Sequence, residues 1–129
     1  MTEFGSRQKT KVFRLANAHG ITVNITNFGG KIMSLCAPNR DGVVADIVLG
    51  YDTLKGYLSG NPYFGALIGR YGNRIAKGKF SIDGNPYQLN INSRGNSLHG
   101  GPNGFHNKIW NSLKSDSVKY KKCFWGIKT

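Results

Sequence analysis

The chain has 129 residues, of which 39% are hydrophobic and 19% are charged, a balance typical of a globular protein rather than a disordered one. Its 18 glycines against 4 prolines predict many tight turns, as in a protein of short strands. No apolar stretch is long enough to span a membrane, and the first residues lack the apolar core of a signal peptide. We therefore expect a cytoplasmic protein with no membrane partner.

The formal net charge of +12 is typical of proteins that bind nucleic acid or anionic surfaces. The basic residues do not gather in an arginine-rich helix or a recognition motif, so we favour charge scattered over solvated surfaces. A small basic β protein that binds nucleic acid is the alternative, and a steep salt dependence of polyanion binding would favour it. The basic residues fall near the start (Lys9, Lys11, Arg14), mid-chain (Arg70, Arg74, Lys77, Lys79) and near the end (Lys114, Lys119, Lys121, Lys122, Lys128).

Two cysteines are present, and neither is flanked by residues at metal-ligand spacing. Cys36 lies in an apolar run and is interpreted as a small buried hydrophobe. Cys123 lies in a basic and aromatic segment. We predict no metal site, and no disulfide in a reducing compartment.

The first half of the chain reads as a succession of strands. Apolar and polar residues alternate over Ile21–Thr26, which predicts a half-buried strand. A second strand is expected over Lys31–Ala37, then a turn over Pro38–Gly42. Val43–Leu49 is expected to form a third, hydrophobic strand.

A short helix and a further strand are expected next. Tyr51–Leu58 places apolar residues at helical spacing, which predicts one or two turns of helix with Asp52 as a possible cap. Tyr63–Ile68 is apolar and predicts a strand.

The second half combines a hairpin with a long loop. Phe80–Ile82 and Tyr87–Leu89 flank an Asp83-Gly84 turn and predict a β-hairpin. Asn90–Asn107 is rich in Gly and Asn, and a long irregular loop of this kind is often functional. A linker is the alternative, but the apolar residues in and after this loop favour packing against a core. The pattern as a whole predicts an all-β, antiparallel protein with little helix.

His99 is the first residue suited to chemistry. The glycines at 100 and 101 leave its side chain little crowded and let a ligand approach the backbone. A neutral imidazole both donates and accepts, so it can bind a polar ligand, and histidine exchanges protons near neutral pH. The alternative is a loop histidine satisfied by backbone groups.

Asn73 and Arg74 are the second pair. Both carry paired polar groups that can bridge adjacent polar groups of a ligand. On spacing alone, surface polar residues around a turn made by Gly69 and Gly72 are the better interpretation. Arg70 is a structural anchor that could pair with a carboxylate.

Other patterns do not identify a site. Gly72–Gly78 lacks the ending of a phosphate-binding loop, and Gly100–Gly104 is not placed between a strand and a helix as a dinucleotide site requires. His19 and His106 have no partners at ligand spacing, and His106 is expected to cover Trp110.

Residues from about Phe13 to Trp110 resemble the N-terminal part of the aldose 1-epimerase (galactose mutarotase) family. Several short blocks in the right order carry this resemblance. They are Asn27-Phe28-Gly29-Gly30, Tyr51-Asp52-Thr53-Leu54-Lys55-Gly56-Tyr57, Gly65-Ala66-Leu67-Ile68-Gly69-Arg70, Asn73-Arg74-Ile75-Ala76, Asp83-Gly84, Asn96-Ser97-Leu98-His99-Gly100-Gly101, and Gly104-Phe105 with Trp110.

The resemblance implies a large antiparallel β-sandwich, the supersandwich of this family. It also implies interconversion of the α and β anomers of galactose and glucose, without metal or organic cofactor. A base removes the anomeric proton and an acid protonates the ring oxygen, so the ring opens and closes again. By the resemblance, Asn73 and Arg74 hold sugar hydroxyls. His99 lies near the ring oxygen, where it binds the sugar or assists protonation as a catalytic residue.

The chain also departs from the family. The family's carboxylate base, its principal acid histidine and another acidic sugar ligand lie further along than residue 129. Residues 1–111 are expected to form the N-terminal portion of the sandwich, and 112–129 a divergent basic and aromatic tail that packs poorly or forms an irregular segment. Position 106 holds His where the family typically has Asp. We expect a truncated chain with little activity, or, as the alternative, a non-catalytic carbohydrate-binding fragment.

Overall fold

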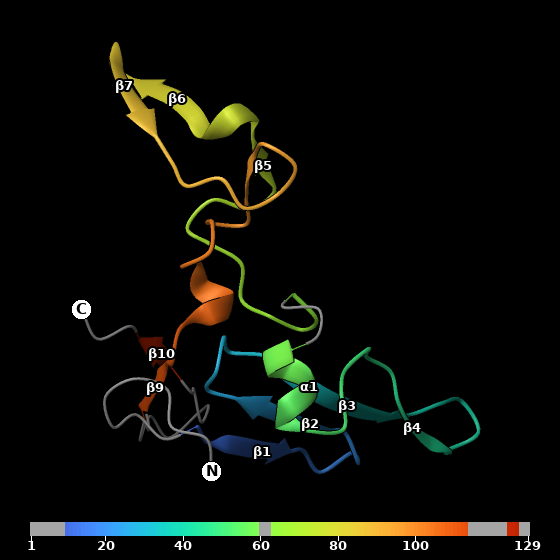
Figure 1. Cartoon of the computed structure of the whole chain (residues 1–129). Coiled ribbons are helices and arrows are strands. Elements are labelled where there is room, and N and C mark those ends of the chain that lie inside the picture. The colour runs from blue at the N-terminus through green and yellow to red at the C-terminus, as the bar shows by residue number, and fades with distance from the viewer. Residues whose placement is uncertain (1–9, 60–62, 114–123, 127–129) are drawn as a thin grey trace.

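The computed structural model describes residues 10–59, 63–113 and 124–126. Within these residues the chain forms short strands with one short helix, and all strand pairs are antiparallel (Figure 1). This confirms the predicted all-β, antiparallel class. No helix in the described part is long and apolar enough to cross a membrane.

The largest unit is a four-stranded meander in the order β1-β2-β3-β4. The expected strands over 21–26 and 31–37 are present as β2 and β3, while β1 was not predicted because nearly all of its residues are exposed and it shows no clean alternation. The strands are β1 (Val12–Ala16), β2 (Thr22–Thr26), β3 (Ile32–Pro38) and β4 (Val44–Asp46).

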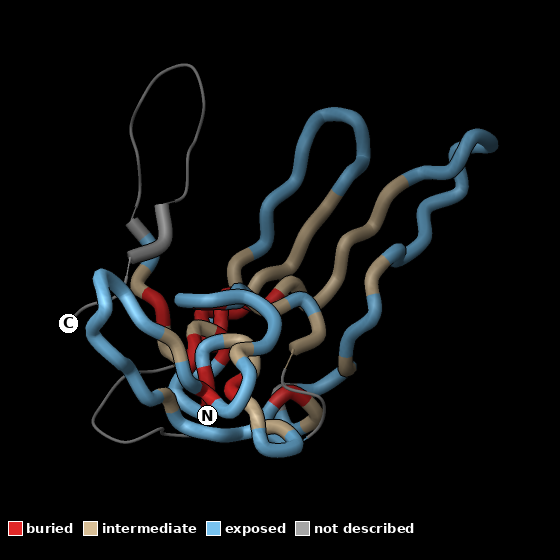
Figure 2. Tube along the Cα trace, turned by 90° about the horizontal axis from the view of Figure 1, so that it is seen from above, coloured by how far each residue is buried: buried red, intermediate tan, exposed pale blue. Residues whose placement is uncertain are grey.

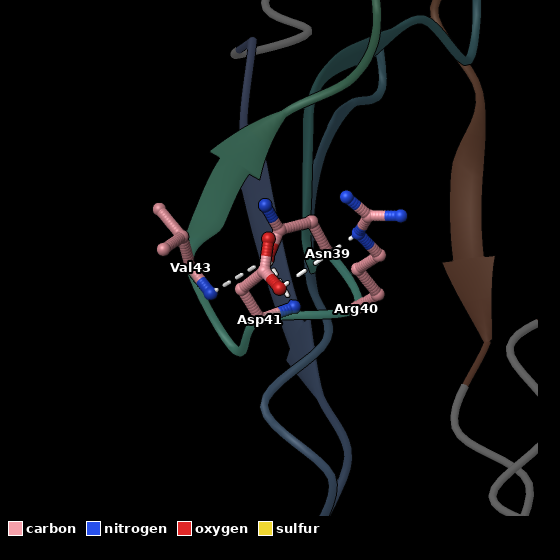
Figure 3. A network of polar contacts seen from close by, with 4 residues as sticks. All are labelled: Asn39, Arg40, Asp41 and Val43. Carbon is pink, nitrogen blue, oxygen red and sulfur yellow. Dashed lines mark hydrogen bonds and ion pairs between the residues drawn. The ribbon is translucent and has the colours of Figure 1, made fainter.

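The turn between β3 and β4 is held by one side chain (Figure 3). Oδ1 of Asn39 accepts from the backbone N–H groups of Asp41 and Val43, both at 2.9 Å. An asparagine that bonds its own backbone in this way supports a turn without tertiary contacts. The Arg40–Asp41 ion pair in the same turn spans 3.8 Å between exposed side chains, so it adds little stability.

The strand expected over Val43–Leu49 is shorter in the structure. β4 ends at Asp46, whose Oδ1 accepts from the backbone N–H of Leu35 at 3.0 Å and of Val48 at 3.1 Å. The carboxylate of Asp46 thus accepts hydrogen bonds from backbone N–H groups that a longer strand would pair with backbone carbonyls. The expected length was wrong because hydrophobicity alone does not reveal this competition.

The predicted helix is present as α1 (Leu54–Ser59). Its first turn is closed by Thr53, whose Oγ1 accepts from the N–H of Gly56 at 3.4 Å, so Asp52 is not the cap. The helix packs against β3, where the hydroxyl of Tyr57 donates to the carbonyl of Met33 at 3.3 Å.

Tyr63–Ile68 does not form the strand that its apolar residues predict. The chain turns here, with the N–H of Ala66 donating to the carbonyl of Tyr63 at 3.1 Å. Gly65 adopts a φ of +63°, and a Cβ at this position would overlap the carbonyl of Ile32. The close approach to β3 requires glycine in a left-handed conformation, which an extended strand cannot contain.

The second half of the described chain forms two small ribbons. The predicted hairpin is confirmed as β6 (Lys79–Ile82) and β7 (Asn85–Gln88), joined by a two-residue turn. Figure 1 shows this hairpin at the end of the molecule away from the four-stranded sheet. The other ribbon and the 3-10 turns are β5 (Arg74–Ile75), β8 (Ser97–Leu98), η1 (Ala76–Gly78) and η2 (Phe105–Asn107).

The segment after Trp110 contains regular structure. β9 (Asn111–Leu113) pairs with β10 (Phe124–Gly126) in an antiparallel register. The expectation of an irregular segment is therefore wrong for the residues of these two strands, because pairing with another segment supplies a strand that local periodicity does not show. The rest of that segment lies outside the described residues. The division between 111 and 112 stays a prediction, although β9 crosses it.

The buried centre is small and partly polar. Figure 2 shows the buried residues gathered at the centre, while the projecting hairpins are intermediate near the centre and exposed toward their tips. Every residue from 26 to 31 is buried, and the buried hydrophobic side chains of the described part are Phe28, Tyr57 and Trp110. Among the described residues, fourteen large hydrophobic side chains are exposed instead, Leu49 to 75%. Such exposure fits a segment that forms part of a larger sandwich.

Candidate functional site

The pairing of β5 with β8 brings Asn73, Arg74 and His99 together. Arg74 is opposite Leu98 in the register, so Asn73 and His99 lie opposite each other at the next position. The N–H of His99 donates to the carbonyl of Asn73 at 3.0 Å. Asn73 and His99 are 26 positions apart in the sequence, and the pairing of β5 with β8 brings them together.

Side-chain bonds tie the same residues into one unit. The backbone N–H of Asn73 donates to Nδ1 of His99 at 3.0 Å, and Nη1 of Arg74 donates to Oδ1 of Asn73 at 3.4 Å. Asn73 and Arg74 are exposed and His99 is partly exposed. The unit therefore presents an amide, a guanidinium and an imidazole to solvent from one ribbon.

Two residues of this unit, Asn73 and His99, have a left-handed backbone conformation. Asn73 has a φ of 63° and His99 a φ of 53°. Asparagine tolerates this region, but histidine adopts it at some cost in free energy. The pairing of β5 with β8 and the hydrogen bond to Nδ1 offset this conformational free energy and hold His99 in place.

Gly100 is required for close backbone packing, whereas the sequence predicted that it lets a ligand approach. Its φ is +86°, and a Cβ here would overlap the carbonyl of Gly69. The position that a Cβ would occupy is thus filled by the backbone at Gly69. The glycine lets the 69–70 segment lie directly against the loop that carries His99.

A cavity of about 710 Å³ adjoins the unit. Arg74 and Gly100 are among its lining residues, whereas Asn73 and His99 are not among those the structure places on its wall. Its walls are largely apolar, and its basic groups are Arg70, Arg74 and Lys108. Arg70 lies over the ring of Phe105, 5.7 Å from its centroid, rather than beside a carboxylate of the described residues.

His106 does not cover Trp110 as expected. The ring of Phe105 packs edge-on against Trp110, with centroids 5.2 Å apart, while the ring of His106 lies 4.9 Å from that of Tyr63. His106 is 3% exposed, and its Nδ1 has no hydrogen-bond partner among the described residues. Burial, then the positive charges of Lys31 and His99, hold the pKa of His106 below its usual value.

Lys31 is a second buried titratable residue near this point. It is 1% exposed, its Nζ lies 4.1 Å from the centroid of the Phe28 ring, and it donates to the carbonyl of Tyr57 at 3.5 Å. Burial lowers the pKa of Lys31 from 10.5 to about 8. No carboxylate of the described residues pairs with it.

The sequence predicted Asn73, Arg74 and His99 as site residues, and the site itself stays a prediction. It did not indicate that Tyr63, His106 and Lys31 lie near them. Tyr63 lies in a segment that was predicted as a strand, and Gly65, two residues later, was the available signal for a turn.

Among the described residues, no group of three or more His, Cys, Asp or Glu side chains is placed to hold a metal ion. Cys36 is a free thiol, and it is partly exposed rather than buried.

The chain matches known proteins over most of its length. The family described as Aldose 1-epimerase matches residues 11–124. Bovine galactose mutarotase is 46% identical over 103 residues, which are 79% of this chain and 30% of the bovine protein. Aldose 1-epimerase of Escherichia coli is 35% identical over 103 residues, which are 80% of this chain and 30% of the bacterial protein.

Solved structures agree with this match. The GalM/aldose epimerase homologue of C. elegans superposes with a TM-score of 0.77 at 31% identity, over 83% of this chain and 33% of that one. Galactose 1-epimerase of Lactobacillus acidophilus shows the same fold, with a TM-score of 0.72 at 22% identity over 91% of this chain and 33% of that one. The chain thus spans about a third of the length of these proteins. It belongs to the aldose 1-epimerase family.

Proposed function

We propose that this chain supplies one side of the sugar site of an aldose 1-epimerase. Asn73 and Arg74 hold adjacent sugar hydroxyls, and His99 donates from Nε2 to the ring oxygen or a hydroxyl beside it. The observation that carries the proposal is the hydrogen-bonded unit of these three residues on the β5–β8 ribbon. An amide, a guanidinium and an imidazole together provide several donors at fixed spacing, as a polyhydroxyl ligand requires.

Anomer interconversion needs a base at the anomeric hydroxyl and an acid at the ring oxygen. His99, with its proton on Nε2, suits the acid side. No carboxylate of the described residues lines the cavity, and Asp41 and Asp46 are engaged in the β3–β4 region. We propose that the base comes from outside the described residues, and that no organic cofactor or metal takes part.

Galactose and glucose are the proposed substrates. The support is the name galactose mutarotase borne by relatives such as the bovine protein. We also propose a cytoplasmic location, for which the free thiol of Cys36 is consistent with a reducing compartment.

Titration of the 129-residue chain with galactose, followed by NMR, tests the site. Arg74→Gln should weaken binding by about 10- to 100-fold, because a charge-assisted hydrogen bond contributes roughly 1.5–3 kcal/mol. Arg14→Gln is the control, since Arg14 is exposed on β1 and the change in net charge is the same. Equal affinities for the two variants would refute the role of Arg74.

Polarimetry of freshly dissolved α-galactose tests turnover. We expect a rate close to the uncatalysed one, because an acid or a base each contributes about 10²–10⁴-fold and the base is absent from the site described. Sugar binding without turnover would support the alternative function, a non-catalytic carbohydrate-binding chain. Rapid turnover that is lost in His99→Ala would show that the 129 residues hold a complete catalytic site.

A further inference from the structure

Three aromatic rings from separate segments stand in a row beside the candidate site. The rings of His99 and Tyr63 meet edge-on, with centroids 4.8 Å apart and planes inclined at 64°. The rings of Tyr63 and His106 meet in the same manner, at 4.9 Å and 62°. Tyr63 therefore lies between the partly exposed histidine of the site and a buried histidine.

The buried end of the row is fixed by backbone contacts. A Cβ on Gly104 would come within 2.9 Å of Nδ1 of His106, and a Cβ on Gly29 would overlap the carbonyl of His106. The N–H of Gly29 also donates to the carbonyl of Lys108 at 2.7 Å. Because the backbone at Gly29 and Gly104 packs against His106, the imidazole is held in place and provides a fixed packing surface for the ring of Tyr63.

The exposed end is less constrained. The structure gives the His99 ring one hydrogen bond, from the N–H of Asn73 to Nδ1. A single bond fixes the place of Nδ1 but leaves the ring free to tilt about it, and a tilt moves Nε2, which the ligand must meet. The edge contact with Tyr63 is the remaining restraint that the structure shows on this tilt.

We propose that Tyr63 is a positioning residue for His99, held against the imidazole by the buried His106. The effect on sugar binding, in which Nε2 of His99 is aimed at the sugar, rests on the proposed function. The geometry itself does not depend on a ligand. Tyr63 acts on His99 and does not itself need to contact the sugar.

The sugar-free chain tests this geometry. Long-range ¹⁵N NMR of His99 reports which nitrogen carries the proton, and the wild-type chain should show Nδ1 unprotonated and Nε2 protonated. Tyr63→Leu keeps apolar bulk but removes the ring. Nδ1 should still accept from the N–H of Asn73, while the ring tilts about this bond and the His99 ring signals broaden. Tyr63→Phe keeps the ring and should retain the wild-type spectrum. Tyr87→Leu removes a tyrosine ring that stacks on Phe80 elsewhere and should leave His99 unchanged.

A galactose titration of the same variants adds the functional consequence. Tyr63→Leu should lose about 2- to 10-fold in affinity, which corresponds to the 0.5–1.5 kcal/mol that an aromatic contact contributes. Tyr63→Phe should bind as the wild type does. If no variant and no wild type binds galactose, the proposed function fails while the NMR result still stands.

An unchanged His99 spectrum in Tyr63→Leu would overturn the inference. Should that variant not fold, Tyr63→Met is measured in the same way, because its unbranched side chain fills irregular space. Broadened His99 ring signals in Tyr63→Phe would also contradict the inference, since they would assign the effect to the hydroxyl group and not to the ring.

Discussion

The backbone N–H of Asn73 donates to Nδ1 of His99 at 3.0 Å, and this bond determines what His99 can offer to a ligand. A ring nitrogen that accepts a hydrogen bond carries no proton, so neutral His99 carries its proton on Nε2. The site therefore presents a donor at the end of the ring remote from the backbone. Because the bond comes from the main chain, the sequence at position 73 does not determine it; the left-handed turn there does.

Replacing His99 by Asn should separate the structural role of this side chain from its proposed role in binding. The amide oxygen of Asn can accept from the N–H of Asn73 much as Nδ1 does, and Asn tolerates the φ of 53°. Stability should stay within about 0.5 kcal/mol of the wild type, while galactose affinity should fall by about tenfold, the equivalent of one hydrogen bond. Urea denaturation and a galactose titration measure the two effects.

His99→Ala is the companion variant. It removes both the acceptor and the proposed donor, so it should lose about 1 kcal/mol of stability in addition to the sugar affinity. If His99→Asn were as destabilised as His99→Ala, the bond to Nδ1 would not be the contact that matters. If His99→Asn bound galactose as the wild type does, His99 would not be a sugar ligand.

Gly100→Ala should be among the most damaging small substitutions in this chain. The added Cβ would overlap the carbonyl of Gly69 and lie 3.0 Å from the N of Arg70, at a φ of +86°. Strain and overpacking together should cost about 3 kcal/mol. Gly84→Ala is the matched control, with a φ of +79° and nothing within 4 Å of the added Cβ.

The control substitution isolates the conformational term. Gly84→Ala should cost about 1 kcal/mol, the price of the left-handed region alone. Urea denaturation of both variants gives the difference. Equal losses would mean that the segment at 69–70 can move away from Gly100, and that the close approach does not hold the two parts of the site together.

Tyr57→Phe tests the contact between the helix and the main sheet. Tyr57 is 2% exposed, its hydroxyl donates to the carbonyl of Met33 at 3.3 Å, and it accepts from the N–H of Tyr51 at 3.1 Å. Removing the hydroxyl should cost about 1–2 kcal/mol, because both backbone groups lose their partner. Tyr87→Phe, at a ring that is 47% exposed, should show almost no change. A neutral Tyr57→Phe would mean that water replaces the hydroxyl.

Local signals predicted the parts of the fold that local chemistry determines. The Asp83-Gly84 turn and the Asn39 turn are both specified by residues within or beside them, and both hairpins are where the sequence places them. The segment 63–68 was mispredicted because its conformation depends on Gly65 approaching Ile32, which lies more than thirty positions earlier. β10 has a similar origin, since its partner is the distant β9.

The candidate site divides in the same way. Asn73, Arg74 and His99 lie in short blocks that a family resemblance can identify. Tyr63 and His106 became neighbours of the site only through ring contacts across segments, which no spacing reveals. Local periodicity also could not show that Lys31, a charged residue at the start of a strand, would be buried.

Lys31→Met should stabilise the chain near pH 7. Lys31 is buried without a carboxylate partner among the described residues, so its charge is poorly compensated. An apolar side chain of similar length removes that desolvation cost, and a gain of about 1 kcal/mol is expected despite the loss of the contact with Phe28. Lys55→Met, at an exposed position on α1, is the control and should be nearly neutral. Destabilisation by Lys31→Met would show that the contacts of the ammonium group outweigh its burial.

The free energy of unfolding should rise with pH in two windows. Between pH 8 and 10.5 the unfolded chain binds a proton at Lys31 that the folded chain has released, so the free energy of unfolding increases across this window.

His106 gives a second window below its usual pKa of 6.5, because burial and then the charges of Lys31 and His99 lower the pKa of His106 in the folded chain. Acid should therefore destabilise the chain as His106 is forced to take up a buried charge. Urea unfolding from pH 5 to 11 gives the profile. Lys31→Met should remove the alkaline window and weaken the acid one, because burial still lowers the pKa of His106 but the charge of Lys31 no longer does. A profile that is flat above pH 8 in the wild type would mean that Lys31 is solvated in the folded chain.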